Sequence, residues 1–399
     1  MLSVEEALAR IIADVTPTVV DTIPIERAAG RVLAEPLTAR ITQPPFDASA
    51  MDGYAVRAAD VAKLPAKLRI IGQAAAGHPF DGEVRPGEAV RIFTGAPVPA
   101  GANAIVIQEN TTSTDGFVEV REGNPDSGHI RRRGFDFKEA EIILQAGRRL
   151  GPRELTLAAA AGYGELPVRR KPLVAILATG DELVPPGILP GPGQIVSSNP
   201  LGVAAMLMQA GAETRLLGIA NDTRDSLVQH IEAARDADVL VTIGGASVGD
   251  HDLVGPVLQS LGMELSFWKI AMRPGKPMLH GRLGSQRVLG LPGNPVSSLI
   301  CTRVFIVPLV RALLGLPQEE AAAMRARLSE PVESNGPRQH YMRAVLERGP
   351  EGHPQVRLAR SQDSSLLAPL AASNALIVRP PHAPALPAGS EVSVLLLDF

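Results

Sequence analysis

From residue 173 to about residue 316, short apolar runs alternate with segments in which apolar positions recur every three or four residues. The runs predict strands at 173–178, 214–219, 239–243 and 267–270, and the other segments predict helices near 200–209, 224–235 and 253–261. This alternation is typical of a parallel sheet with crossover helices. We therefore expect an α/β unit whose ligands bind outside the carboxyl ends of its strands.

The rest of the chain has a different pattern. Ser3 and Glu6 form a capping-box pattern that predicts a helix at the N-terminus, and Pro152 to Gly162 predicts a second one. Between them, short apolar runs separated by Gly and Pro predict strands at 68–72, 89–93 and 104–107. After residue 316, apolar residues alternate with polar ones, which predicts a small separate β domain.

Composition narrows the class of protein. At 399 residues the chain exceeds one hydrophobic core, so we expect two to four domains. A net charge of -3 argues against a broad basic surface for nucleic acid or anionic lipid. A single cysteine, Cys301, and an acidic N-terminus without a signal-peptide pattern favour a cytoplasmic location. Two arginines interrupt the apolar stretch at 296–316, so we expect no membrane span.

A glycine-rich turn follows the strand predicted at 239–243. Three glycines occur within six residues, and two acids precede the next helix; the polar and glycine positions are Gly244, Gly245, Ser247, Gly249, Asp250 and Asp252. One interpretation is an ordinary tight turn with a capping Asp. The other is an anion site, because glycine-rich turns between a strand and a helix expose backbone N–H groups. The acids would then indicate a metal beside the anion.

A second acidic turn supports a metal. Asp181 and Glu182 follow the strand predicted at 173–178 and would meet Asp250 and Asp252 at one edge of the sheet. Like charges about 4 Å apart repel by roughly 4 kcal/mol at an effective dielectric near 20. A divalent cation such as Mg²⁺ would remove that repulsion and bridge to phosphate oxygens.

Basic residues lie on and after the last predicted parallel strand. Lys269, Arg273 and Lys276 are placed there to meet an oxyanion, Lys as a point charge and Arg as a bidentate fork. Together with the acidic turns, they suit a phosphorylated ligand, a metal and a second oxyanion. Neither a nucleophile pattern nor the sequence motif of a P-loop is present.

Seven motifs then identify a resemblance. In chain order they are PFDASAMDGYA at 45–55, IFTGAPVP at 92–99, RGFD at 133–136, TGDEL at 179–183, GGASVGD at 244–250, PGKP at 274–277 and LPGNP at 291–295. The chain resembles the molybdopterin molybdenumtransferases, the family that includes the E domain of gephyrin, over nearly its whole length.

The resemblance implies a reaction and an architecture. Adenylylated molybdopterin and molybdate would give molybdenum cofactor and AMP with a divalent cation such as Mg²⁺, and the molybdopterin adenylyltransferase is the expected partner. Four parts are implied: a discontinuous N-terminal subdomain (1–42 and 139–171), an inserted β-rich module (43–138), a molybdopterin-binding α/β domain (172–316) and a C-terminal β barrel (317–399). It also implies a homodimer with a composite active site.

The resemblance also implies roles for individual residues. The implied catalytic acids are Asp52, Asp136 and Asp252. The implied metal ligands are Glu182, Asp250 and Asp252. The implied substrate-binding positions are Thr94, Asp181, Glu182, Gly244, Gly245, Ser247, Gly249, Asp250, Lys269, Pro292 and Pro295. Those implied to bind molybdate are Arg273, Lys276, Pro277, Arg338 and Ser364, with Arg273 standing where the family commonly has Lys.

Three alternatives remain open at this point. A tungstate-inserting relative would use almost the same residues. A non-catalytic scaffold that binds molybdopterin and clusters partners, as gephyrin-like proteins do, is a second reading. A regulator that binds a nucleotide through the α/β unit is a third, although such a binder has little need of Asp52 and Asp136.

Overall fold

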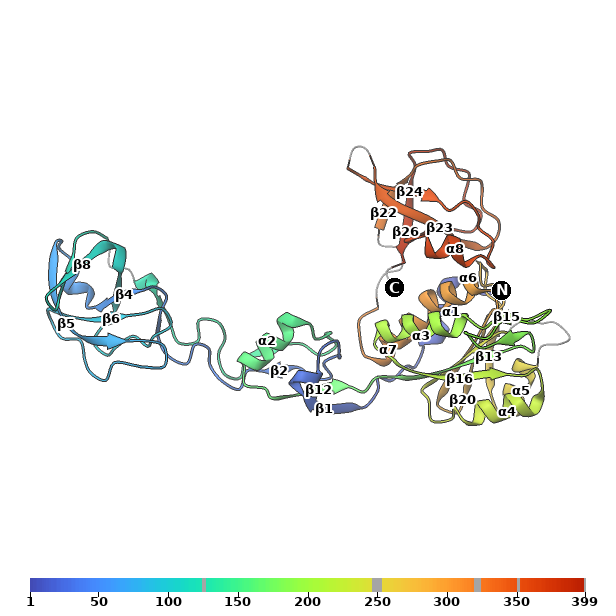
Figure 1. The fold of residues 1–399 in the computed structure, drawn as a ribbon, viewed down its shortest axis with the longest axis horizontal. Helices are drawn as coiled ribbons and strands as arrows, with labels where there is room; N and C mark the ends of the chain where they lie inside the picture. Colours follow the sequence, from blue (N-terminus) through green and yellow to red (C-terminus); the bar gives the residue numbers. More distant parts are fainter. Residues whose placement is uncertain (124–126, 246–252, 319–323, 350–351, 398–399) are drawn as a thin grey trace. The chain divides into compact units, whose positions relative to one another are not determined.

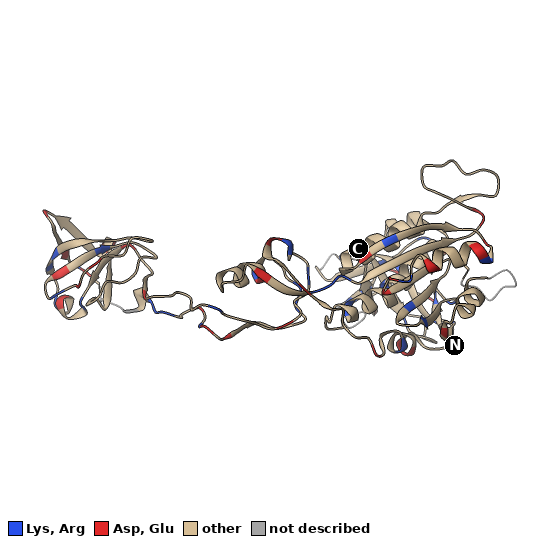
Figure 2. Ribbon diagram, turned by 90° about the horizontal axis from the view of Figure 1, so that it is seen from below, with Lys and Arg blue, Asp and Glu red and all other residues tan. Residues whose placement is uncertain are grey.

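The computed structural model describes residues 1–123, 127–245, 253–318, 324–349 and 352–397. The chain forms two compact units, which we describe separately. Unit 1 contains residues 1–21, 30–34 and 168–399, and unit 2 contains residues 22–29 and 35–167. The four-part division implied by the resemblance, with its boundaries, stays a prediction. Basic and acidic residues are interspersed in each unit (Figure 2).

A six-stranded sheet organises the first part of unit 1. Its strand order is β16-β13-β17-β21-β20-β18. The bounds are β13 (Leu173–Thr179), β16 (Glu213–Ala220), β17 (Val239–Ile243), β18 (Glu264–Trp268), β20 (Leu279–Leu283) and β21 (Gln286–Leu291). Strands β16, β13, β17 and β21 are parallel neighbours, so the carboxyl ends of β13, β17 and β21 lie side by side.

Helices cover both faces of this sheet (Figure 1). Side chains alternate between the two faces along a strand. Ile176 and Val241 pack on one face, with α1, α3 and the helix at 295–313. Leu177 and Leu240 pack on the other face, with α4 and α5. The bounds are α1 (Val4–Ile12), α3 (Asn199–Ala210), α4 (Arg224–Glu232) and α5 (Val254–Ser260). The predicted capping box at α1 is present.

The sheet contains one antiparallel strand that was not predicted. Strand β20 runs antiparallel to both of its neighbours, β18 and β21. Neither β20 nor β21 was predicted, because the polar residues His280, Gln286 and Arg287 interrupt their apolar pattern, although all three are buried. The strand expected at 267–270 ends earlier, at Trp268. The other predicted strands and helices of the sheet are present within a few residues.

The last helix of the α/β part is long and apolar. It runs from Pro295 to Leu313 as α6 (Pro295–Cys301), a π-helical segment η5 (Thr302–Ile306) and α7 (Val307–Leu313). Its length and composition would allow it to cross a membrane, but 67% of its apolar 18-residue stretch is buried inside the protein. It contributes Ile300, Phe305 and Leu309 to the core between sheet and helices.

The C-terminal part of unit 1 is a closed five-stranded barrel, as expected. The strands follow the order β23-β24-β22-β26-β25, and β25 pairs back with β23 to close the ring. The bounds are β22 (Met324–Leu328), β23 (Gln339–Arg348), β24 (Pro354–Leu358), α8 (Leu367–Ala371), β25 (Ala375–Arg379) and β26 (Glu391–Leu396). The two-residue strand β19 (Met272–Arg273), which lies in the chain between β18 and β20, pairs in parallel with the start of β23.

Unit 2 is rich in β structure. Its six-stranded sheet has the order β7-β4-β6-β5-β9-β8. The bounds are β4 (Gly53–Val56), β5 (Ala66–Ala74), β6 (Glu88–Ile92), β7 (Ala104–Ile107), β8 (Thr111–Thr114) and β9 (Phe117–Val120). Short pairs link early and late parts of the chain: β2 (Leu37–Thr38) with β11 (Ile142–Leu144), and β3 (Ala48–Ser49) with β10 (Ile130–Arg131). Helix α2 spans Pro152–Ala160.

The remaining elements are short. Strand β1 (Val20–Pro24) pairs with β12 (Glu165–Arg169), and β14 (Leu183–Val184) pairs in parallel with β15 (Ile195–Val196). Single turns of 3-10 helix lie at η1 (Ile25–Arg27), η2 (Ala58–Val61), η3 (Gln108–Asn110) and η4 (Ser127–His129).

Candidate functional site

A cavity of about 840 Å³ lies at the carboxyl ends of β13, β17 and β21. This is the edge at which α/β sheets bind ligands. It is large enough for a ligand of nucleotide size. The residues that line it are Ala178, Thr179, Gly180, Glu182, Leu183, Ile195, Val196, Ser197, Ser198, Asn199, Pro200, Asp222, Ile243, Gly244, Gly245, Pro277, Pro292, Gly293, Asn294, Pro295 and Ser365.

The described start of the glycine-rich turn lines this cavity and requires glycine. Gly244 and Gly245 have φ of 99° and 57°, a region that L side chains rarely adopt. A Cβ on Gly244 would lie 2.5 Å from the carbonyl oxygen of Thr179. The Thr179 hydroxyl is buried at the same place and has no partner among the described residues. The other predicted positions of this turn, Ser247, Gly249, Asp250 and Asp252, lie outside the described residues.

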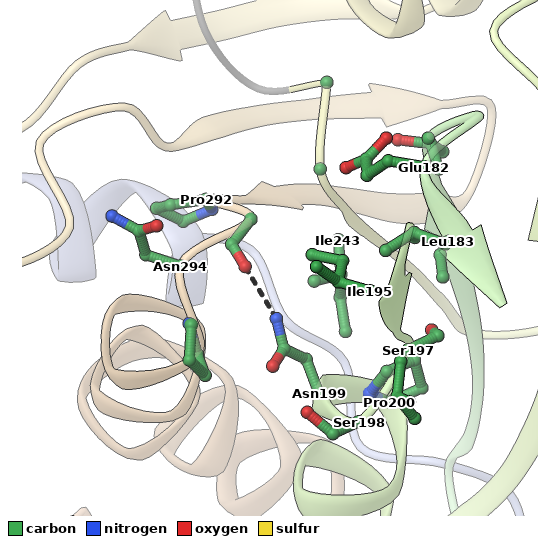
Figure 3. Close-up of a pocket in the computed structure, with 18 of the residues that line it drawn as sticks. Glu182, Leu183, Ile195, Ser197, Ser198, Asn199, Pro200, Ile243, Pro292 and Asn294 are labelled. Carbon is green, nitrogen blue, oxygen red and sulfur yellow. Dashed lines mark hydrogen bonds between the residues drawn. The ribbon is translucent and has the colours of Figure 1, made fainter. Parts of the chain in front are cut away.

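Two helices begin at the cavity wall. Asn199 and Pro200 open α3, and Pro295 opens the helix that runs to Leu313. The side-chain amide of Asn199 donates to the carbonyl of Gly293 at 2.7 Å and links the two helix starts (Figure 3). Helix N-termini carry partial positive charge and unpaired N–H groups, so this end of the cavity favours an anionic group.

The two acids of the second predicted turn differ in placement. The side chain of Glu182 lines the cavity (Figure 3). The carboxylate of Asp181 accepts a 3.0 Å hydrogen bond from the backbone N–H of Asp222 and so holds the adjacent loop. Among the described residues, no three His, Cys, Asp or Glu side chains group as metal ligands do. Mg²⁺ commonly takes one or two carboxylates, water and substrate phosphate oxygens, and Glu182 fits that donor set.

Apolar side chains form another wall of the cavity. Leu183, Ile195, Val196 and Ile243 contribute to it, from β14, β15 and the end of β17. Ile195 is 56% exposed and its neighbour Val196 is 38% exposed, so this wall presents adjacent apolar side chains to the cavity. A flat aromatic group would cover this wall, while an attached phosphate would reach the helix starts.

The C-terminal barrel supplies part of the lining. Ser365 lines the cavity, whereas the predicted Ser364 faces the helix that starts at Pro295. The hydroxyl of Ser364 accepts a 2.9 Å hydrogen bond from the side chain of Asn294, and its carbonyl accepts one from the N–H of Val296 at 3.1 Å.

The basic residues gather beside β23. Arg273 pairs in register with His340, and the positive charges of Arg273 and Arg338 both act on His340. The pKa of His340 is lowered to about 4, mainly because the imidazole is buried and to a lesser extent because of these positive charges. The imidazole is therefore neutral at pH 7. The structure therefore brings together the predicted Arg273 and Arg338 from distant parts of the sequence.

The other predicted residues near the basic group differ in placement. Pro277 and Pro292 line the cavity. Lys276 is exposed, and its backbone carbonyl accepts from Ile270. Lys269 has a φ of 151°, a backbone conformation that is rare for a residue with a side chain and often marks a functional segment.

In unit 2, Asp52 is fixed by Thr94. One carboxylate oxygen of Asp52 accepts from both the backbone N–H and the hydroxyl of Thr94, each at 2.8 Å. These two hydrogen bonds hold the pKa of Asp52 below its usual value. Asp52 is therefore an ionised carboxylate on a loop. Its hydrogen-bond partner, Thr94, is another of the residues predicted to be functional in unit 2.

Asp136 lies on an exposed turn whose conformation is fixed by hydrogen bonds from and to neighbouring residues. Its backbone N–H donates to the carbonyl of Gln43 at 3.1 Å. Asp47 closes the turn, because its carboxylate accepts from the backbone N–H of Arg133 at 2.8 Å and from the side chain of Arg132 at 2.6 Å. The hydrogen bond from Arg133, and the contacts of Arg132, lower the pKa of Asp47.

Several lining residues were not predicted as functional. Asn199, Asn294 and Ser365 are the main ones. Asn294 lies inside the LPGNP motif and precedes a proline at a helix start, so that signal was present. Asn199 likewise precedes Pro200 at the start of α3. Nothing in the sequence distinguishes Ser365 from Ser364, because the loop conformation decides which of them faces the cavity.

Family models match almost the whole chain. The model described as the MoeA N-terminal region, domains I and II, matches residues 2–162. The model of a probable molybdopterin binding domain matches residues 175–312, which contain the cavity's sheet. The model of the MoeA C-terminal region, domain IV, matches residues 325–397, the barrel.

Whole-length relatives agree with these matches. A molybdopterin molybdenumtransferase of Haemophilus influenzae is 34% identical over 99% of this chain and 98% of its own length. One of Nostoc sp. is 35% identical over 93% of this chain and 87% of its own. A solved MoeA structure from Pyrococcus horikoshii superposes with a TM-score of 0.86 at 32% identity and covers 100% of both chains. The chain therefore belongs to the molybdopterin molybdenumtransferase (MoeA) family, transferases of molybdenum cofactor biosynthesis.

Proposed function

We propose that this chain inserts molybdate into adenylylated molybdopterin and releases AMP and molybdenum cofactor. The observation that carries the proposal is the composition of the cavity wall. One part is apolar, around Ile195 and Ile243, and suits a flat pterin. The other combines the glycine turn with the two helix starts at Asn199 and Pro295, and suits a phosphate. Adenylylated molybdopterin has both kinds of group.

The basic group beside β23 is the proposed molybdate site. Arg273 and Arg338 lie close to the same buried imidazole, His340. A neutral imidazole adds no further repulsion between the two arginines, and a dianion would remove the repulsion that exists. Lys269, Lys276, Pro277 and the loop around Ser364 would complete the site, as the resemblance implies.

A divalent cation, Mg²⁺ in the first instance, fits the cavity through Glu182, with Asp250 and Asp252 as further proposed ligands. Once bound, the cation would neutralise phosphate charge and polarise a phosphoryl oxygen. The residues of the chain itself do the positioning. The glycine turn and the helix starts would orient the phosphate, and the apolar wall would hold the pterin and exclude water from that side.

We further propose that Asp52 and Asp136 act in the cavity of a second copy of the chain, so that a homodimer forms the complete site. Asp52 is ionised and fixed by Thr94, which suits a group that orients water or metal at the phosphoanhydride that is cleaved. A cytoplasmic location and substrate delivery by a molybdopterin adenylyltransferase belong to the same proposal.

Mixing two inactive variants tests both the chemistry and the composite site. Asp52→Ala and Glu182→Ala should each abolish molybdate-dependent AMP release. If each site combines Asp52 of one copy with Glu182 of the other, a re-equilibrated 1:1 mixture contains heterodimers with one intact site, and activity returns to roughly a quarter of wild type. Absence of recovery in a mixture shown to exchange subunits would refute the composite site. Full activity of Asp52→Ala would remove Asp52 from the mechanism.

A further inference from the structure

Arg343 is a buried arginine whose guanidinium donates hydrogen bonds to one loop. It lies on β23 and is 1% exposed. Its guanidinium donates to the backbone carbonyls of Leu366 at 2.9 Å, Ser361 at 2.9 Å and Asp363 at 2.8 Å. A buried guanidinium is costly unless its N–H groups find partners, and three of the five donate to residues 361–366. Burial lowers the pKa of Arg343.

The same loop has a second set of hydrogen bonds to the same residue. The side chain of Gln362 accepts from the backbone N–H of Arg343 and donates to its carbonyl, both at 2.9 Å. Within the loop, one carboxylate oxygen of Asp363 accepts from the N–H and the hydroxyl of Ser365, at 2.9 and 2.8 Å. The path of the loop is therefore determined by Arg343 on one side and by Asp363 on the other.

This loop contributes one residue to the lining of the candidate site. Ser365 lines the cavity. Ser364, next to it, accepts hydrogen bonds from Asn294 and Val296 at the start of α6. Arg343 also lies on the same strand as His340, and its charge, with those of Arg273 and Arg338, contributes to the lowered pKa of that histidine.

We propose that Arg343 is a positioning residue for oxyanion binding in this site. It acts through residues 361–366, which it holds so that Ser365 reaches the cavity and Ser364 holds the helix start at Asn294. This inference rests on the proposed function, because it names a residue that supports the proposed molybdate pocket. Arginine is required since its planar fork serves three carbonyls at once, whereas a lysine ammonium is a single point on a flexible stem.

The substitution Arg343→Lys keeps the charge and removes the fork. In the full-length chain we expect the KM for molybdate to rise about tenfold, with kcat for AMP release within about twofold of wild type. Amide hydrogen exchange of residues 361–366 should accelerate at the same time. The matched control is Arg287→Lys, in which a buried arginine that donates to the carbonyls of Ile11 and Ala13 at the opposite end of the sheet is changed in the same way. It should leave the KM unchanged.

The outcomes separate this inference from the proposed function. If wild type releases AMP with molybdate, and Arg343→Lys has unchanged KM and unchanged exchange, the role of Arg343 is refuted. If wild type shows no molybdate-dependent release, the proposed function fails, and exchange of the loop alone decides whether Arg343 holds it. Should Arg343→Lys not fold, Asp363→Ala replaces it, because Asp363 is exposed and braces Ser365 from the other side. A raised KM supports the inference, and a wild-type KM overturns it.

Discussion

Replacing Gly244 by alanine should damage the cavity more than the fold. The residue has a φ of 99°, and an L side chain in a left-handed conformation costs about 1–2 kcal/mol. The added Cβ would also lie 2.5 Å from the carbonyl oxygen and 2.9 Å from the hydroxyl of Thr179. Such contacts need at least about 3.0 Å. The turn or the end of β13 must therefore move by roughly 0.5 Å, the difference between this minimum and the 2.5 Å to the carbonyl oxygen of Thr179.

The movement would occur where the phosphate is proposed to bind. Binding of adenylylated molybdopterin, followed by fluorescence or calorimetry, should weaken by more than about tenfold in Gly244→Ala, because a positioning error of this size is felt at an anion site. The matched control is Gly284→Ala. Gly284 has a φ of 64° in the hairpin between β20 and β21, and a Cβ there would meet nothing within 4 Å. It should lose a similar 1–2 kcal/mol of unfolding free energy, about the cost of the left-handed conformation, and keep wild-type binding.

Equal binding by Gly244→Ala and Gly284→Ala would refute this reasoning. It would mean that the glycine turn does not contact the ligand, or that the Thr179 backbone moves away without cost. If Gly244→Ala loses binding but no more stability than Gly284→Ala, the loss of binding comes from the changed geometry of the glycine turn and not from general destabilisation.

Three further predictions concern single side chains. Thr94→Val removes the hydroxyl donor to Asp52, so the pKa of Asp52 should rise and the acidic limb of the pH–rate profile should move to higher pH; an unmoved limb would exclude Asp52 as the titrating group. Glu182→Gln should raise the Mg²⁺ concentration for half-maximal AMP release about tenfold, and an unchanged requirement would remove Glu182 from the metal site. Burial lowers the pKa of both His280 and His340 to about 4 in the folded chain, against 6.5 ordinarily. As the pH falls, these histidines are therefore protonated in the unfolded chain before they are protonated in the folded chain, which lowers the stability of the fold. Their contribution is present above pH 6.5 and is lost as the pH falls towards 4; urea unfolding should show about 2 kcal/mol less stability per histidine at pH 5 than at pH 7.5, and His280→Gln should remove its share. A wild-type pH dependence in that variant would contradict the assignment.

The part of the fold that followed from the sequence is the part with uninterrupted apolar patterns. The strand at Val239–Ile243 has five consecutive apolar or β-branched residues, all of them buried, and it was predicted with its bounds. The hairpin of β20 and β21 was missed because its buried positions include His280, Gln286 and Arg287. The side-chain N–H groups of Gln286 and Arg287 donate to backbone carbonyls of distant residues, Ala234 and Ile11. These hydrogen bonds depend on tertiary contacts, which the pattern of a single strand does not contain.

The candidate site divides in the same way. The turns at the ends of β13 and β17 could be assigned to the sheet edge because the topology of a parallel sheet places them there. The gathering of Arg273 and Arg338 depends on the pairing of β19 with β23, and only the family resemblance indicated it. Which of Ser364 and Ser365 lines the cavity depends on the loop that Arg343 holds, through contacts between a barrel strand and a segment 18 to 23 residues away.

One measurement tests the central claim most directly. The full-length chain would be incubated in single turnover with adenylylated molybdopterin and Mg²⁺, with molybdate, with tungstate and with neither, and AMP would be quantified. The account predicts about one AMP per active site with molybdate and little without an oxyanion. Equal release with tungstate would widen the substrate class without changing the chemistry. AMP release that is independent of the oxyanion, or no release from a chain that binds the substrate, would contradict the proposed transfer.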